Sequence, residues 1–200
     1  MKFFLLLGLL SLLSYSVDAQ NNEHTVEGDK ILVPSPTYRP FRELCLRSDR
    51  IMYDYELGYR MGEFYLDRER FDKMASESKM IMFCSPHNPS GLVFSKSDLE
   101  FVLSVAKKYD IPVLSDEIHA DLVHPGIDHF PMGRANEAIG AKCITYMAPS
   151  KTFNVAGEHS GIAIFSDKAM QEAFVKKQRA LWVTSPGFLI GELTQTAYKD

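Results

Sequence analysis

Cysteine is scarce in this sequence, and so is any concentration of positive charge. The chain of 200 residues holds three cysteines, Cys45, Cys84 and Cys143. Their number is odd, their spacing is wide and two of them lie in apolar runs, so we expect buried thiols, not a disulfide framework or metal ligands. The net charge is −4 and no long basic run occurs, which gives no reason to expect nucleic acid as a partner.

A hydrophobic run long enough to span a membrane is also missing. The N-terminal apolar stretch, 3–13, is well short of the roughly 20 residues that a membrane span needs. It follows the basic Lys2 and precedes the small residue Ala19, a pattern typical of a secretory signal peptide. We therefore predict a signal peptide over 1–19, a polar linker over 20–28 and a secreted protein. A gene-model error at the N-terminus would instead make the protein cytoplasmic.

The remainder of the chain, 29–200, alternates between short apolar runs and amphipathic segments, without an internal repeat. A composition of 46% hydrophobic and 24% charged residues suits one globular domain with a core. Strands are expected at 31–33, 51–53, 80–84, 111–114, 143–147 and 161–165, and helices at 38–46, 67–75, 95–106, 168–181 and 186–198. Pro34 and Pro36 are expected to end the first strand. This alternation predicts an α/β fold of three layers, in which helices cover both faces of a mainly parallel sheet.

Three of the expected strands end in polar segments. Asn88 follows the third strand and lies between prolines, although Asn-Pro-Ser-Gly is also a common turn sequence. Asp116 follows the fourth strand, either as a solvated loop charge or as a partly buried carboxylate that needs a partner. Lys151 follows the fifth strand. Because ligands bind beyond the carboxyl ends of the strands in open α/β sheets, we expect these three side chains to converge there.

Lys151 is the most reactive candidate among them. A lone lysine is normally a solvated surface charge. Here Ser150 places a hydroxyl beside it, and Phe153, Val155 and Ala156 are expected to form an apolar wall. Such a wall would desolvate the ammonium group, lower its pKa and make the amine nucleophilic.

The three polar segments, in this order, resemble those of a known family. They are Pro-His-Asn-Pro-Ser-Gly at 86–91, Ser-Asp-Glu-Ile-His at 115–119 and Ala-Pro-Ser-Lys-Thr-Phe-Asn at 148–154. They resemble the pyridoxal-phosphate enzymes of the fold-type I aminotransferase class. The Asp-Glu-Ile-His form is similar to the cystathionine β-lyase branch, the MalY/PatB-like carbon-sulfur lyases. The resemblance covers about half of a family chain, so 29–200 is predicted to be an incomplete large domain that binds pyridoxal 5'-phosphate.

The resemblance implies a role for each side chain at the strand ends. Lys151 would form the Schiff base with the cofactor aldehyde, and Asp116 would pair with the pyridine nitrogen and make the ring an electron sink. Asn88 and His119 would hydrogen-bond the phenolic oxygen, and His119 stands in the place of the usual tyrosine. Tyr38 would stack on the ring, and Ser150 would contact the phosphate.

The resemblance also implies features that the sequence does not hold. Family members have a Gly-rich phosphate-binding turn upstream of Tyr38, a phosphate-binding arginine where this chain has His159, and a small C-terminal domain that grips the substrate carboxylate. We therefore expect a fragment with little turnover of its own.

Three functions remain open on the sequence alone. The first is a carbon-sulfur β-lyase for cystathionine or cysteine S-conjugates, or a related aminotransferase, with an amino-acid substrate and, when complete, a homodimeric assembly. The second is a secreted, degenerate relative that acts as a binding or interaction protein. The third is a generic α/β domain in which the motifs occur by chance.

Overall fold

The computed structural model describes residues 25–158, 161–180, 182 and 190–199. The predicted signal peptide, 1–19, most of the linker predicted over 20–28, and His159 lie outside these residues. No helix within the described ranges has the length and hydrophobicity that crossing a membrane requires.

The centre of the fold is one sheet of six strands in the order β2-β1-β5-β6-β7-β8. The strands are β1 (Lys30–Ser35), β2 (Ile51–Glu56), β5 (Met80–Cys84), β6 (Val113–Asp116), β7 (Cys143–Met147) and β8 (Ile162–Phe165). The first five strands in this order, β2, β1, β5, β6 and β7, pair in parallel, and β8 joins the edge antiparallel to β7. The predicted three-layer α/β fold with a mainly parallel sheet is confirmed.

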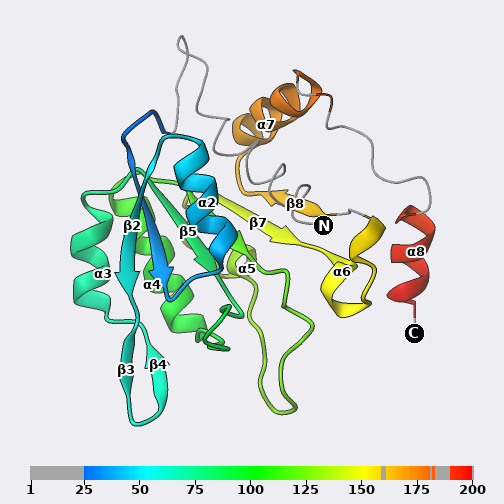
Figure 1. The fold of residues 1–200 in the computed structure, drawn as a ribbon, viewed down its shortest axis with the longest axis horizontal. Coiled ribbons are helices and arrows are strands. Elements are labelled where there is room, and N and C mark those ends of the chain that lie inside the picture. Colours follow the sequence, from blue (N-terminus) through cyan, green and yellow to red (C-terminus); the bar gives the residue numbers. More distant parts are fainter. Residues whose placement is uncertain (1–24, 159–160, 181, 183–189, 200) are drawn as a thin grey trace.

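Helices cover both faces of this sheet (Figure 1). The helices are α2 (Arg39–Arg47), α3 (Arg68–Ala75), α4 (Lys96–Lys108), α5 (Met132–Ala135), α6 (Pro149–Thr152), α7 (Lys168–Ala180) and α8 (Ile190–Ala197), with a short 3-10 turn at Ala156–Glu158. Helices α3, α4 and α5 pack on one face, and α2 and α7 pack on the other. The two faces therefore have separate hydrophobic clusters.

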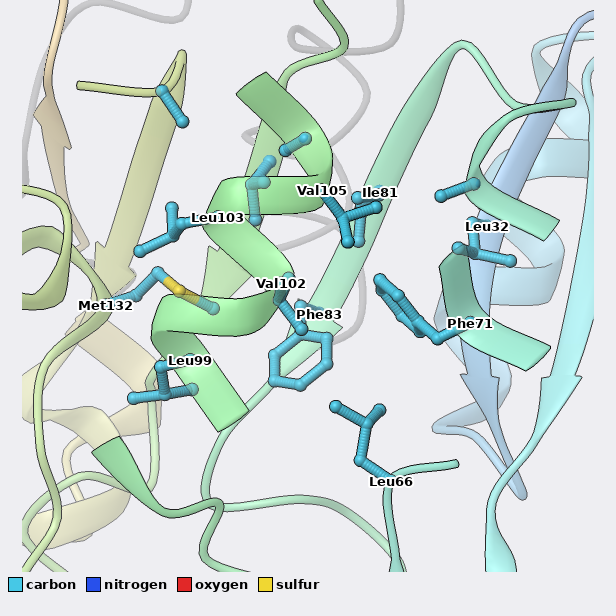
Figure 2. Packing of buried hydrophobic residues seen from close by; sticks show 14 of the residues in the cluster. Leu32, Leu66, Phe71, Ile81, Phe83, Leu99, Val102, Leu103, Val105 and Met132 are labelled. Carbon is cyan, nitrogen blue, oxygen red and sulfur yellow. The ribbon is translucent and has the colours of Figure 1, made fainter. Parts of the chain in front are cut away.

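The larger cluster surrounds α4, whose sequence specifies both its start and its buried face. The Ser95 side chain caps the helix by accepting a hydrogen bond from the backbone N–H of Asp98 at 3.2 Å. Leu99, Val102 and Leu103 are fully buried against the sheet, where Figure 2 shows them beside Phe83 and Met132. Fully burying one such side chain contributes about 1.5–3 kcal/mol. This packing fixes the middle strands, β5 and β6, on which the candidate site depends.

The expectation that Pro34 ends the first strand is wrong. Strand β1 continues to Ser35, and Pro34 pairs with Tyr55 of β2. On the opposite side, β1 pairs with β5 only at Ile31 and Leu32. The N–H that proline lacks is therefore not required for the ladder at this position.

A hairpin that the sequence analysis did not predict follows β2. It consists of β3 (Gly58–Arg60) and β4 (Glu63–Tyr65), which pair antiparallel. The two residues between them, Met61 and Gly62, have φ values of 53° and 90°. Positive φ at both positions is typical of the type I′ turn, whose twist matches that of the flanking strands. Met61 is an unusual residue for such a turn, so the local sequence indicates the hairpin only weakly.

Candidate active site

The carboxyl ends of β5, β6 and β7 meet at one small pocket. Its lining comes from the last residues of β5 and β6 and from the segments that follow β1, β5, β6 and β7. The lining residues are Tyr38, Cys84, Asn88, Asp116, Ile118, His119 and Lys151. The volume is about 30 Å³, which is small beside the roughly 300–1,000 Å³ of pockets that hold whole ligands. These side chains therefore form the floor of a site. A larger concavity of about 520 Å³ lies along α7 and shares no lining residue with it.

The convergence predicted from the sequence is present in this pocket. Asn88, Asp116 and Lys151 all line it, together with Tyr38 and His119. Ser150, the predicted phosphate contact, is half-buried in the first turn of α6 and is not among the lining residues.

Asp116, the last residue of β6, supplies the buried acid. Its side chain accepts a hydrogen bond from the backbone N–H of Ile118 at 3.2 Å. Burial raises the pKa of this carboxyl from 3.8 to about 6, the charge of Glu117 adds to the rise, and the Ile118 N–H and Lys151 oppose it. No cation among the described residues forms an ion pair with Asp116. The site thus offers a poorly solvated carboxylate to a ligand that brings positive charge or an N–H donor.

Lys151 lies on α6, the short helix that follows β7 (Figure 1). The expected apolar wall does not bury it, because Lys151 is exposed and Phe153, Val155 and Ala156 are only half-buried. Exposure on one side leaves the amine accessible while it lines the pocket on the other.

A carboxylate from the neighbouring loop holds α6 in place. Asp121 accepts hydrogen bonds from the Thr152 hydroxyl at 2.9 Å and from the Tyr198 hydroxyl at 2.8 Å. The Tyr198 ring also meets Phe153 edge-on, with 4.8 Å between ring centroids. Asp121 therefore anchors the residue beside Lys151 and connects it to α8.

Asn88 lies in a tight turn and also lines the pocket, so the turn and the ligand-binding interpretations of its sequence are compatible. The neighbouring His87 donates its backbone N–H to Leu92 O at 2.8 Å and accepts from Gly91 N at 2.7 Å. Its Nδ1 lies 2.7 Å from the Ser90 hydroxyl. Burial lowers the pKa of His87 from 6.5 to about 4, which keeps the ring neutral. The turn thereby holds Asn88 at the edge of the pocket.

His119 faces the pocket from the loop after β6. Burial lowers its pKa first, the nearby Lys151 lowers it further, and a hydrogen bond with the Pro86 carbonyl acts in the opposite direction. The imidazole is therefore neutral at neutral pH and does not compete with Lys151 as a cation.

Two residues near the pocket were not assigned to the site from the sequence. Cys84 Sγ donates a hydrogen bond to the Pro86 carbonyl at 3.2 Å. Burial raises the pKa of its thiol, so the thiol is unreactive and serves only as part of the pocket lining.

Tyr146 pairs with Asp116 across β6 and β7, and its hydroxyl is buried without a hydrogen-bond partner among the described residues. Burial and the Asp116 charge raise its pKa. Only the register of the two strands, which the sequence does not display, brings Tyr146 to this place.

The donor set fits a planar heteroaromatic aldehyde such as pyridoxal phosphate. A primary amine lines the pocket, the carboxylate of Asp116 forms no ion pair with a described residue, and an amide from Asn88 and the ring of Tyr38 complete the floor. A protonated ring nitrogen would supply the positive charge that the buried carboxylate lacks.

Known proteins are similar to this chain in both sequence and fold. Cystathionine beta-lyase PatB of Bacillus subtilis is 32% identical over 169 residues, which are 84% of this chain and 43% of the relative. Cystalysin of Treponema denticola, whose structure contains a pyridoxal 5'-phosphate cofactor, superposes with a TM-score of 0.80 and 31% identity over 95% of this chain and 46% of its own. The pyridoxal-phosphate-bound C-S lyase of Staphylococcus hominis gives a TM-score of 0.85 and 27% identity over 98% and 47%.

These matches span the described fold but not the full length of the relatives. The chain covers less than half of each of the three proteins. The family model of aminotransferase class I and II matches residues 24–191, which include every residue of the pocket. On this match the chain belongs to the aminotransferase class I and II family.

Proposed function

We propose that this chain is the cofactor-binding part of a pyridoxal-phosphate-dependent carbon-sulfur β-lyase that acts on cystathionine or a cysteine S-conjugate. The observation that carries the proposal is the convergence of Lys151, Asp116 and Asn88 in one pocket. The similarity to a cystathionine beta-lyase and to two pyridoxal-phosphate-containing structures supports the choice of cofactor and chemistry.

Each residue of the pocket has a distinct task in this proposal. Pyridoxal phosphate, when bound, supplies an electron sink for negative charge at the substrate Cα. Asp116 would hold a proton on the pyridine nitrogen by charge pairing, because its carboxylate is poorly solvated. Asn88 and His119 would hydrogen-bond the phenolic oxygen, and Tyr38 would orient the ring by stacking. Lys151 would hold the cofactor through its amine, and the free amine would be placed to accept the α-proton of the substrate as a general base.

Cofactor capture is the first test. With added pyridoxal phosphate the purified full-length protein is expected to turn yellow, and borohydride is expected to fix the label on one peptide that contains Lys151. Lys151→Ala should abolish this labelling, whereas Lys168→Ala, on an exposed lysine of α7, should leave it unchanged. Labelling that spreads over several lysines and persists in Lys151→Ala would refute the assignment.

The reaction itself separates the lyase from an aminotransferase. Offered an S-substituted cysteine, the full-length protein should release pyruvate and a free thiol, and this release should be lost in Lys151→Ala and strongly reduced in Asp116→Ala. Exchange between an amino acid and a keto acid without thiol release would reassign the protein as an aminotransferase. Failure of both reactions with retained cofactor would favour the degenerate binding protein.

The location and assembly of the protein belong to the same proposal. We propose that the protein is exported and cleaved before Gln20, on the strength of the apolar segment 3–13 and Ala19. N-terminal sequencing of the native protein tests this, and a native chain that retains Met1 would refute it. Homodimerisation of the full-length protein is proposed by analogy with the family and is tested by its mass in solution.

A further inference from the structure

A second acidic residue follows Asp116 and lies on the opposite face of the sheet. Side chains alternate between the faces of a strand, so Asp116 shares a face with Leu114, and Glu117 shares the other with Ser115. Leu114 belongs to the cluster under α2 and α7, and Val113 belongs to the cluster under α4 and α5. Glu117 therefore points away from the pocket, and the function proposed above gives it no task.

Glu117 is nonetheless hydrogen-bonded through both of its carboxylate oxygens. Its side chain is fully buried, and it accepts hydrogen bonds from the Ser115 hydroxyl at 3.0 Å and from the backbone N–H of Met132 at 2.9 Å. A third comes from Nε2 of His129 at 2.7 Å, and the His129 side chain is only 7% exposed. The other ring nitrogen of His129, Nδ1, is buried without a partner among the described residues.

These contacts join the two ends of one long loop. Glu117 stands at the start of the loop that follows β6, and His129 and Met132 stand at its end, where α5 begins. Between them, 119–128 contains only turns, and Leu122 and Ile127 are exposed. The tip of the loop is exposed, and the bonds at its base are among the contacts that hold it.

The same loop supplies side chains to the pocket and to the lysine helix. Ile118 and His119 line the pocket, and Asp121 holds Thr152 beside Lys151. The backbone N–H of Glu117 also donates to Tyr146 O at 2.8 Å, which continues the pairing of β6 with β7. A change at the base of the loop is therefore transmitted to both sides of the pocket.

We propose that the Glu117–His129 pair is a positioning device, which closes the 117–132 loop at its base and so places His119 and Asp121 for cofactor binding. Glu117 and His129 are positioning residues, because neither lines the pocket. This inference rests on the proposed function. A buried carboxylate–imidazole pair is rarely the most stabilising choice for a core, because apolar residues of the same volume often do as well. The directional hydrogen bonds that the Glu117–His129 pair forms explain its presence at the base of the loop.

The first test measures the loop in the full-length protein without cofactor. Amide hydrogen exchange should show faster exchange at Ala120 and Leu122, whose N–H groups bond Glu117 O and His119 O, in both Glu117→Gln and His129→Gln. We expect an increase of about fivefold or more, as for coupled residues of one network. The matched control is Asn136→Ala, which removes two buried hydrogen bonds to Ala141 just after α5. Equal acceleration in the control, or none in the two variants, overturns the proposal.

The second test measures cofactor binding. The dissociation constant for pyridoxal phosphate should rise about fivefold or more in Glu117→Gln and in His129→Gln, and the double variant should be no worse than either. Asn136→Ala should lower the melting temperature without changing this constant. Unchanged affinity with a loosened loop would show that the loop does not position the site. If the wild-type protein takes up no pyridoxal phosphate, the proposed function fails, and the exchange experiment alone decides whether the pair closes the loop.

Discussion

Two helices of equal length show how differently two regions of this fold are packed. Helices α4 and α7 both have 13 residues, but α4 buries Leu99, Val102, Leu103, Val105 and Ala106, whereas α7 buries only Met170 and Phe174. The strands beneath them differ in the same way: β5 is buried throughout, and β8 leaves Ile162 and Ile164 about half exposed, at 50% and 51%. The candidate site lies across this difference, since Asp116 belongs to the densely packed part and Lys151 to the sparsely packed part.

The two reactive groups are therefore controlled in different ways. The environment of Asp116 is set by a close-packed core, which resists change and desolvates the carboxylate. The environment of Lys151 is set by a few polar contacts, chiefly those of Asp121 with Thr152 and Tyr198. Core substitutions should therefore act on stability, and substitutions near α6 should act on binding.

The largest expected effect comes from removing one aromatic ring from each region. Phe83→Ala should lower the free energy of unfolding by about 3–5 kcal/mol, because Phe83 is fully buried against Phe71 and Phe94. Phe174→Ala, whose ring contacts Phe165 beside the exposed strand β8, should cost about 1–2 kcal/mol. Urea unfolding of the two variants measures this. Equal losses would remove the distinction between the two regions.

An intermediate effect is expected from pH, where two buried groups oppose each other. The pKa of Asp116 is raised from 3.8 to about 6, so this group contributes stability below 3.8 that is lost as the pH rises through 6. The pKa of His87 is lowered from 6.5 to about 4, so this neutral ring contributes stability above 6.5 that is lost as the pH falls through 4. Each contribution is about 3 kcal/mol at full strength.

Single substitutions should separate the two contributions in the cofactor-free protein. Asp116→Asn should make the free energy of unfolding fall more steeply than that of the wild type between pH 6 and pH 4, because only the His87 effect remains. In His87→Gln only the Asp116 effect remains, so the free energy of unfolding should rise relative to that of the wild type as the pH falls from 6 to 4. Urea titrations at several pH values measure both. Parallel pH curves for the wild type and Asp116→Asn would show that Asp116 is not desolvated.

The smallest expected effect on stability lies at the helix that carries Lys151. Asp121→Asn weakens two exposed hydrogen bonds and should cost less than about 1 kcal/mol of unfolding free energy. It should nevertheless weaken pyridoxal-phosphate binding severalfold, because Thr152 is no longer held. Tyr198→Phe is the matched control, since it removes only the bond from Tyr198, just after α8. Binding that weakens equally in both variants would assign the effect to the bond with Tyr198 and not to the bond with Thr152.

The sequence predicted the parts of this fold that depend on local pattern. The apolar run at 80–84 and the cap at Ser95 specify their elements directly, and three strand-end motifs were enough to place Asn88, Asp116 and Lys151 together. Other features depend on partners distant in sequence. The exposure of Lys151 depends on how α6 leaves β7, and the proximity of Tyr146 to Asp116 depends on strand register. The role of the Glu117 carboxylate could not be read from the sequence, because His129 meets it only through the folded loop.

The alternation of side chains along β6 has a consequence for insertions and deletions. Removing one residue from β6 would turn Asp116 and Glu117 each to the other face of the sheet. The pocket would then receive the glutamate side chain. His129 would face the aspartate side chain, which is too short to reach it. Extra residues at the exposed tip of the loop, near Gly126, would change neither face. Their entropic cost grows slowly, by about 0.6 kcal/mol for a doubling of loop length. Variation in length is therefore compatible with this site between Leu122 and Ile127, while between Val113 and Glu117 even one residue decides which acid serves the pocket.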